Sequence, residues 1–374
     1  MEYRTLREEK VSLLGFGCMR FPVKKGKIDE EASRKMLERA LEAGVTYFDT
    51  AWPYHDGKSE AFVGSVLSGF DRSRYQLATK LPVWLVHSRE DARSFVEKQL
   101  ANLRTDYIDF YLLHAMNGQR WQEMLSFGVP EALEECRAEG KIRKLGFSFH
   151  GPYGDFERIL KARKWDFCQI QLNYMDVDDQ AGKRGADLAR ELGIPVVIME
   201  PLKGGSLAAL PEDAMAPLRA INPASTAVEW ALRFLAGDRN IRVLLSGMGS
   251  MEQLEENLRI CDSPASLNAE EEAALERAKQ VLDSRVRNGC TACRYCMPCP
   301  HGVDIPRNFA LWNDWGKYSN AREARWNWHN PDFASARADA CVQCGECVPK
   351  CPQNIPIPSD LSRAAAELSA VKRL

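Results

Sequence analysis

The sequence lacks the features that would place it in a membrane, in a secretory pathway or on nucleic acid. Its 374 residues contain no apolar run of the roughly 18 residues that a membrane-spanning helix needs. The first ten residues, MEYRTLREEK, mix acidic and basic side chains and contain no apolar segment, which argues against a secretory signal. The net charge of −2 gives no reason to expect nucleic acid or an anionic membrane as a partner. We therefore expect a cytoplasmic protein, long enough for one large domain and a small one.

A glycine-rich dinucleotide fingerprint is also missing. The segment GFGCMR follows the first expected strand, but it lacks the third glycine of G-x-G-x-x-G and continues into FPVKKGK. This segment is more typical of a small hairpin or loop than of a phosphate-binding loop. An open, doubly wound sheet is therefore the less favoured of two α/β architectures.

Short apolar runs alternate with amphipathic stretches over roughly 260 residues, as is typical of a parallel barrel. Strands are expected at 12–17, 45–49, 75–80, 107–114, 143–148, 166–172, 195–200 and 241–246. Helices are expected at 30–43, 89–103, 131–139, 154–163, 180–192, 223–236, 250–260 and 268–285. The predicted fold is a (β/α)8 TIM barrel over residues 1–285, followed by a small, loop-rich α-helical domain over residues 286–374.

Four polar side chains fall at the expected carboxyl ends of consecutive barrel strands, where barrel enzymes carry their chemistry. Asp49 ends the second strand, Tyr54 follows it, and Lys80 and His114 end the next two strands. Each of them alone could be a cap or a solvated surface group. Together they make chemical sense, because an ammonium lowers the pKa of a nearby phenol and a carboxylate keeps the ammonium charged. A histidine beside them can orient a carbonyl, so the set predicts protonation of a carbonyl oxygen while hydride reaches its carbon.

Eight of the twelve cysteines lie in two short runs, CTACRYCMPCP at 290–300 and CVQCGECVPKCP at 341–352. In C-x-x-C-x-x-C-x-x-x-C-P, three thiolates wrap one [4Fe–4S] cubane and the fourth reaches a second cluster. The second run has this spacing in full, and the first is one residue shorter before its last cysteine. Zinc is the alternative for paired C-x-x-C motifs. By the logic of two-cluster bacterial ferredoxins, one cluster is predicted on Cys290, Cys293, Cys296 and Cys351 and the other on Cys299, Cys341, Cys344 and Cys347.

On these residues the chain resembles the aldo-keto reductase family over about residues 1–262. The family's catalytic tetrad maps onto Asp49, Tyr54, Lys80 and His114. The resemblance implies NADP(H) or NAD(H), bound by the segments GFSFHG, QIQLN, MEPLKGG and SGMGSMEQLEENL. The residues that it assigns to the cofactor are Ser148, Gln169, Met199, Pro201, Leu202, Gly204, Gly249, Ser250, Gln253, Glu256 and Asn257.

Three positions depart from the family pattern. Phe149 stands where an asparagine is common, and Met199 stands where an aromatic ring often stacks on the nicotinamide. Gln253 stands where many members carry an arginine for the 2′-phosphate, so the choice between NADP(H) and NAD(H) stays open. His150 and Trp84 are candidates for the substrate site or for ordinary surface and packing roles.

The whole chain resembles the subset of aldo-keto reductases that carry a C-terminal ferredoxin-like domain with two [4Fe–4S] clusters. The expected activity is NAD(P)H-dependent reduction of an aldehyde or ketone, sugar-like ones included, or the reverse oxidation of an alcohol. A hydride carries two electrons whereas each cluster moves one, and no flavin motif is present to connect them. Two alternatives therefore stay open: an electron-transfer protein with a ferredoxin-like partner, and a nucleotide-binding redox sensor. The aromatic segment 308–330 is expected to be a packed helical spacer or a docking face for that partner.

Overall fold

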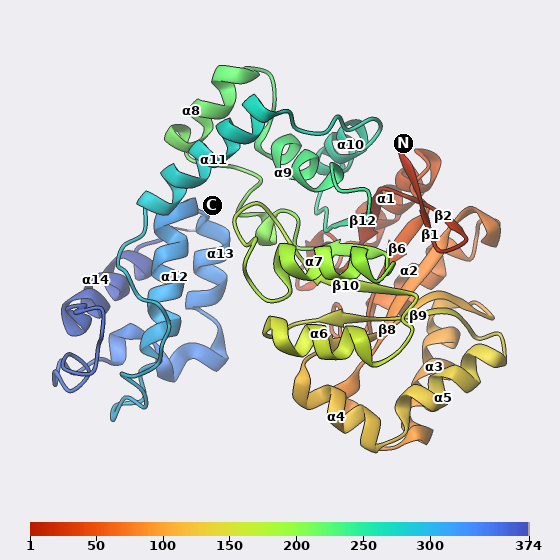
Figure 1. The fold of residues 1–374 in the computed structure, drawn as a ribbon, viewed down its shortest axis with the longest axis horizontal. Coiled ribbons are helices and arrows are strands. Elements are labelled where there is room, and N and C mark those ends of the chain that lie inside the picture. Colours follow the sequence, from red (N-terminus) through yellow and green to blue (C-terminus); the bar gives the residue numbers. More distant parts are fainter. Residues whose placement is uncertain (373–374) are drawn as a thin grey trace. The chain divides into compact units, whose positions relative to one another are not determined.

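Eight parallel strands close into a barrel in the computed structural model, which describes residues 1–372 (Figure 1). In chain order they are β3 (Leu14–Gly17), β6 (Tyr47–Asp49), β7 (Gln76–Leu81), β8 (Ile108–Met116), β9 (Ile142–Phe149), β10 (Phe167–Gln171), β11 (Val196–Met199) and β12 (Ile241–Ser246). The barrel closes because β12 pairs in parallel with β3, with Leu244 opposite Leu14. The predicted barrel is confirmed, and each expected strand lies close to its expected position.

Two antiparallel hairpins precede the regular alternation. The first joins β1 (Tyr3–Leu6) to β2 (Glu9–Ser12), and the second joins β4 (Val23–Lys24) to β5 (Lys27–Ile28). The second hairpin occupies the FPVKKGK segment, where the sequence predicted a hairpin or loop. The missing third glycine is thus accounted for, because the glycines lead only into a 3-10 turn (Cys18–Arg20) and this hairpin, and not into an α-helix.

Residues 1–267 contain ten α-helices. They are α1 (Glu30–Glu42), α2 (Ser59–Leu67), α3 (Arg89–Leu103), α4 (Gly118–Ser126), α5 (Val129–Ala138), α6 (Tyr153–Ala162), α7 (Gly182–Glu191), α8 (Glu212–Ile221), α9 (Ala227–Ala236) and α10 (Met251–Ile260). Asp29, Ser88, Asn117 and Ser250 each accept a backbone N–H in the first turn of the following helix. Among residues 1–372, no helix is both long and apolar enough to cross a membrane.

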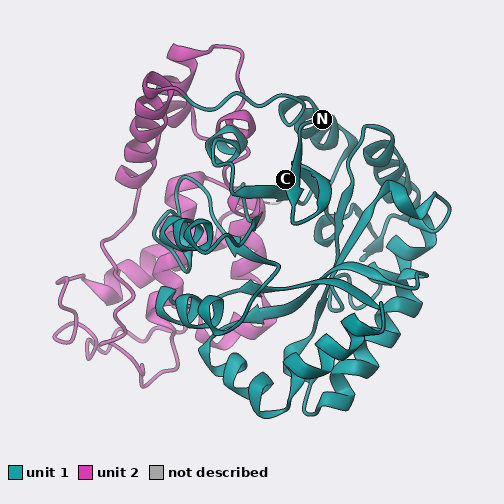
Figure 2. Cartoon of the chain, turned by 45° about the vertical axis from the view of Figure 1, so that its right-hand side comes forward, with its two compact units in different colours: residues 1–202, 231–267 teal, residues 203–230, 268–374 magenta. Residues whose placement is uncertain are grey.

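The chain forms two compact units, drawn in teal and magenta in Figure 2. The first contains residues 1–202 and 231–267 and holds the barrel strands. The second combines residues 203–230 with the chain from Asn268 onward. Its further elements are α11 (Ala269–Ser284), α12 (Ile305–Tyr318), α13 (Ala321–Trp328), α14 (Ile357–Ser369) and the short 3-10 turns η5 (Pro331–Ala336) and η6 (Ala338–Ala340). The domain boundary expected after residue 285 stays a prediction.

Each unit has a core of its own. In the barrel, the ring of Phe110 packs on Tyr47 and Phe167, with centroids 5.1 and 5.4 Å away. In the second unit, Trp312 and Trp328 are fully buried, whereas Trp326 is 73% exposed. The aromatic segment is thus helical, as the spacer interpretation expected. Its buried rings belong to a core against which six of the clustered cysteines pack: Cys290, Cys296, Cys299, Cys341, Cys347 and Cys351.

Candidate active site and cysteine cavities

The structure brings the four predicted catalytic side chains together at the carboxyl ends of β6, β7 and β8. These strands are neighbours in the barrel, so Asp49, Lys80 and His114 lie side by side, and Tyr54 comes from the loop after β6. The Lys80 Nζ atom donates a hydrogen bond of 2.6 Å to Asp49 Oδ1 and one of 3.3 Å to the Tyr54 hydroxyl. The ring of Tyr54 meets that of His114 edge-on, with centroids 6.2 Å apart.

Lys80 is held as a buried ammonium ion. Its side chain is 1% exposed, and Nζ also donates to the Thr50 carbonyl over 2.8 Å. Burial works against the charge, but the Asp49 carboxylate and the Tyr54 hydroxyl outweigh it and raise the pKa of Lys80. Burial also raises the pKa of Tyr54, and the Lys80 charge partly opposes that rise. Tyr54 therefore carries its proton at neutral pH, beside a cation that stabilises the phenolate formed when the proton leaves.

His114 is neutral. Burial, followed by the charge of Lys80, lowers its pKa to about 2. Its Nδ1 atom is buried and has no hydrogen-bond partner among the described residues. The Trp84 ring packs on the imidazole, with centroids 5.1 Å apart. A neutral imidazole with an unused nitrogen can hold a carbonyl or hydroxyl oxygen without adding a charge to the site.

Three of the residues assigned to the nicotinamide lie together on neighbouring strands. Ser148 and Gln169 are opposite one another in the β9–β10 register, and Met199 ends β11. Ser148 Oγ accepts the Ala115 N–H over 2.8 Å, and Gln169 Nε2 lies 3.7 Å from Met199 Sδ. Gln169 Oε1 is buried without a hydrogen-bond partner among the described residues. An unused buried acceptor fits an amide N–H donor such as that of a carboxamide.

The segment after β12 leads into the N-terminus of α10. Ser250 caps the helix, and the Gly249 N–H donates to Gln253 Oε1 over 2.8 Å. The free N–H groups of such a helix end suit a phosphate. Asn257 is buried and its amide donates to Ser246 Oγ over 2.7 Å, whereas Glu256 is half-buried. Asn257 thus already ties the helix to the end of β12, an additional role that the sequence did not indicate.

The remaining residues assigned to the cofactor follow β11. Pro201 and Leu202 come after Glu200, and Gly204 lies in the 3-10 turn η4 (Lys203–Gly205). Gly204 has a φ angle of 64°, a conformation that glycine adopts without strain. The glycine therefore permits a tight turn at this point of the loop.

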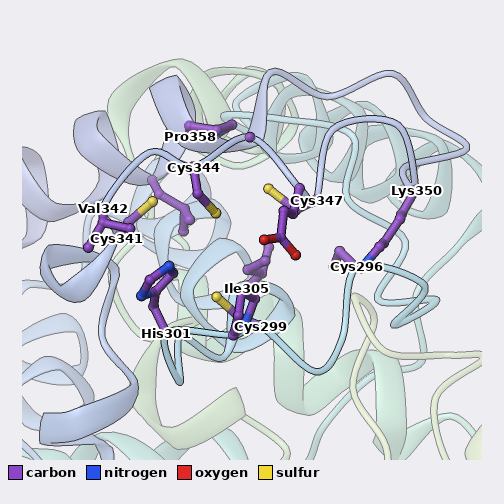
Figure 3. Close-up of a pocket in the computed structure, with 14 residues that line it drawn as sticks. Cys296, Cys299, His301, Ile305, Cys341, Val342, Cys344, Cys347, Lys350 and Pro358 are labelled. Atoms are coloured by element: carbon purple, nitrogen blue, oxygen red, sulfur yellow. The ribbon is translucent and has the colours of Figure 1, made fainter.

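The eight clustered cysteines line two cavities. One, of about 390 Å³, is lined by Cys296, Cys299, Cys341, Cys344 and Cys347. The other, of about 320 Å³, is lined by Cys290, Cys293, Cys296 and Cys351. Figure 3 shows the sulfur atoms of Cys299, Cys341, Cys344 and Cys347 around a common space. Each cavity thus combines cysteines from both runs, and Cys296 lines both cavities; the division into two sets of four stays a prediction.

The donor sets fit clusters of several metal atoms. Burial first, and then the nearness of the neighbouring thiols, raises the pKa of Cys290, Cys296 and Cys347. The thiols of each set line one cavity of several hundred Å³. Four thiols around such a volume match the requirements of a cubane.

Two further side chains line the larger cavity and were not singled out in the sequence. His301 follows the Cys-Pro pair that ends the first run, and Lys350 precedes Cys351. Both are labelled beside the cysteines in Figure 3. Their positions directly beside the cysteine runs could have identified them from the sequence.

The model of the aldo/keto reductase family matches residues 13–280, well over half of the sequence. The chain belongs to the aldo/keto reductase family. A second family model, that of the 4Fe-4S dicluster domain, matches residues 289–355. The protein is thus an oxidoreductase of the aldo/keto reductase family with a C-terminal 4Fe-4S dicluster domain, as the resemblance implied.

Relatives of this family cover most of the barrel. L-galactose dehydrogenase from Arabidopsis thaliana is 27% identical over 73% of this chain and 91% of its own length. An aldo-keto reductase from Mycolicibacterium vanbaalenii is 31% identical over 66% of this chain and 83% of its own. Among solved structures, the holo form of an aldo-keto reductase from Bacillus halodurans aligns with a TM-score of 0.64 at 29% identity. That alignment covers 74% of this chain and 96% of the solved one.

Proposed function

We propose that the barrel reduces the carbonyl group of an aldehyde or ketone with NADPH or NADH, or oxidises the corresponding alcohol. The observation that carries this proposal is the buried Lys80 ammonium, hydrogen-bonded to both Asp49 and Tyr54. The nicotinamide, when bound, supplies or accepts the hydride. The naming of one relative as L-galactose dehydrogenase supports the inclusion of sugar-like substrates.

Each of the four side chains has a distinct task in this reaction. Tyr54 donates its hydroxyl proton to the carbonyl oxygen, and Lys80 stabilises the phenolate that remains. Asp49 keeps Lys80 charged, and neutral His114 holds the carbonyl oxygen in place. In alcohol oxidation the same phenolate takes the hydroxyl proton back.

The nucleotide is assigned to the strand ends and loops that follow the same face of the barrel. Ser148 and Gln169 hold the carboxamide, since Gln169 Oε1 has no partner among the described residues. The other proposed contacts, taken from the family resemblance, are Met199, Pro201, Leu202, Gly204, Gly249, Ser250, Gln253, Glu256 and Asn257.

The dicluster domain is proposed to hold two [4Fe–4S] clusters, which move single electrons when bound. The proposed ligands are Cys290, Cys293, Cys296 and Cys351 for one cluster and Cys299, Cys341, Cys344 and Cys347 for the other. Electron exchange with a ferredoxin-like partner is the second candidate function. It is favoured by the exposure of Cys293 and Cys344, which puts one thiol of each set at the surface.

The decisive experiment measures nucleotide binding and turnover in anaerobically prepared protein. We expect NADPH or NADH to bind in a fluorescence titration, and a panel of aldehydes and ketones to be reduced. The Tyr54→Phe variant keeps the ring but loses the proton, so its kcat should fall by about 10² to 10⁴. Nucleotide affinity should stay nearly unchanged.

Tyr3→Phe is the matched control, because the Tyr3 hydroxyl bonds the Gly44 carbonyl at an exposed position in the N-terminal hairpin. It should react at the parent rate. Lack of binding of either nucleotide would rule out the reductase proposal. Full activity of Tyr54→Phe would show that a different group donates the proton.

A further inference from the structure

Arg120 is a half-buried cation without an evident structural role in the barrel. It lies in the first turn of α4, directly after the strand that carries His114. Its Nη1 atom donates to the Ala115 carbonyl, and no carboxylate pairs with it among residues 1–372. The acid at this helix end, Asp155, accepts the Gly118 N–H and pairs with Arg158 instead. Because the N-terminus of a helix is its positive end, an unpaired arginine there is unfavourable for the helix itself.

A single aromatic ring connects this cation to the catalytic side chains. The guanidinium carbon of Arg120 lies 5.6 Å from the centroid of the Trp84 ring. The centroid of the Trp84 ring also lies 5.1 Å from the centroid of the His114 ring. Trp84 is 39% exposed and Leu85 beside it is 44% exposed, so this apolar surface is open to solvent. A molecule lying on Trp84 would thus be near both the His114 imidazole and the Arg120 guanidinium.

The electrostatics of the two neighbouring histidines agree with this placement. Burial is the main cause of the low pKa of both His114 and His150, and the charge of Arg120 lowers both further. Glu200 and Asp179 act on His150 in the opposite direction. Among the charged side chains that shift these two pKa values, Lys80 and Arg120 thus act on His114, whereas Arg120, Glu200 and Asp179 act on His150.

We propose that Arg120 and Trp84 form a substrate subsite that selects carbonyl compounds bearing a carboxylate. The apolar part of the substrate lies on Trp84, and the carboxylate accepts hydrogen bonds from the guanidinium N–H groups that Ala115 leaves free. The planar fork of an arginine suits a carboxylate better than a point charge does. This inference rests on the proposed carbonyl reduction and adds the substrate class to it.

The test compares 4-carboxybenzaldehyde, which carries a carboxylate, with its methyl ester, methyl 4-formylbenzoate, which carries no charge. The parent protein, with both clusters in place, should have the higher kcat/KM for the acid. The ratio of kcat/KM for acid over ester should fall roughly 10- to 100-fold in Arg120→Met, as expected when a charge-assisted hydrogen bond is lost. Arg120→Lys keeps the charge but loses the fork, so its ratio should lie in between.

Arg93→Met is the control, since Arg93 lies on α3 and pairs with Glu135 and Glu139 at the surface. Its ratio should equal that of the parent. An unchanged ratio in Arg120→Met, or a parent protein that prefers the ester, would overturn the subsite. The parent measurement needs no variant, so a misfolded Arg120→Met protein would still leave the inference testable. Failure to reduce either aldehyde, or any other carbonyl, would count against the proposed function instead.

Discussion

At the scale of single residues, the Lys80–Tyr54 contact has a consequence for pH dependence. The charge of Lys80 lowers the pKa of Tyr54, so Lys80→Met should raise that pKa further above its ordinary value of 10. Alcohol oxidation requires the phenolate, whose fraction at a given pH falls when the pKa rises. We therefore expect the alkaline rise of kcat/KM for oxidation to move to higher pH, with a loss on the order of 10² to 10⁴ near neutrality.

A pH profile of alcohol oxidation by the parent and Lys80→Met checks this expectation. Lys35→Met serves as control, because Lys35 forms an exposed pair with Glu31 on α1 and should leave the profile unchanged. An identical midpoint in the parent and Lys80→Met would mean that the ammonium does not set the acidity of Tyr54.

The sequence indicated which residues form the candidate site, but it did not indicate their protonation or their ion pairing. The spacing of Asp49 and Tyr54, and the strand ends at Lys80 and His114, were visible as a pattern. The protonation state of His114 was not, because its pKa depends on burial and on Lys80, which only the fold brings close. The unpaired state of Arg120 was invisible for the same reason, since it depends on where each acidic side chain finally points.

At the scale of elements, the eight barrel strands were predictable because each is a short apolar run. Within residues 1–285, three helices were not anticipated, namely α2, α4 and α8. Helix α4 is short and begins with Gly118, and α8 contains Pro217, both of which weaken a helical pattern. The β1–β2 hairpin was also missed. It turns through Arg7 at a φ of 54°, without the glycine or asparagine that usually marks such a turn.

The N-terminus of α10 offers a test of nucleotide preference. Gln253 lies in its first turn, and its side chain accepts from the Gly249 N–H. Gln253→Arg would place a cation where many relatives in the family are expected to hold the 2′-phosphate. We expect its Kd for NADPH to fall on the order of tenfold, the change that about 1.4 kcal/mol produces. The Kd for NADH should change much less.

Fluorescence titrations with both nucleotides measure this difference. Glu252→Arg, at the neighbouring exposed position of the same helix, controls for a general increase in positive charge. Equal tightening for NADPH and NADH in Gln253→Arg would show that this position does not face the 2′-phosphate.

At the scale of the whole molecule, the two cysteine cavities predict the metal content. Anaerobically prepared protein should contain about eight irons per chain, together with acid-labile sulfide, as two cubanes require. Air exposure should bleach the broad visible absorbance. The cysteine runs at 290–300 and 341–352 should then become sensitive to protease, because their folding is coupled to the metal.

The core around Trp312 and Trp328 modifies this expectation for the rest of the unit. That core is apolar and fully buried, so α12 and α14 should resist protease longer than the cysteine runs do. Metal analysis and limited proteolysis followed by mass spectrometry measure both effects. Stoichiometric zinc without sulfide would contradict the cluster assignment, and cleavage spread evenly over the unit would contradict a core that stands without metal.

Each proposed ligand set combines cysteines from both runs, and this arrangement bears on when the metal can be inserted. The cavity of Cys290, Cys293 and Cys296 is completed by Cys351, and the cavity of Cys299 by Cys341, Cys344 and Cys347. During synthesis, about fifty further residues must therefore be added after the first run before either set has all four cysteines. With the proposed ligands, neither cluster should be completed before Cys347 has been synthesised. With these proposed ligand sets, cluster maturation should follow the synthesis of the second run.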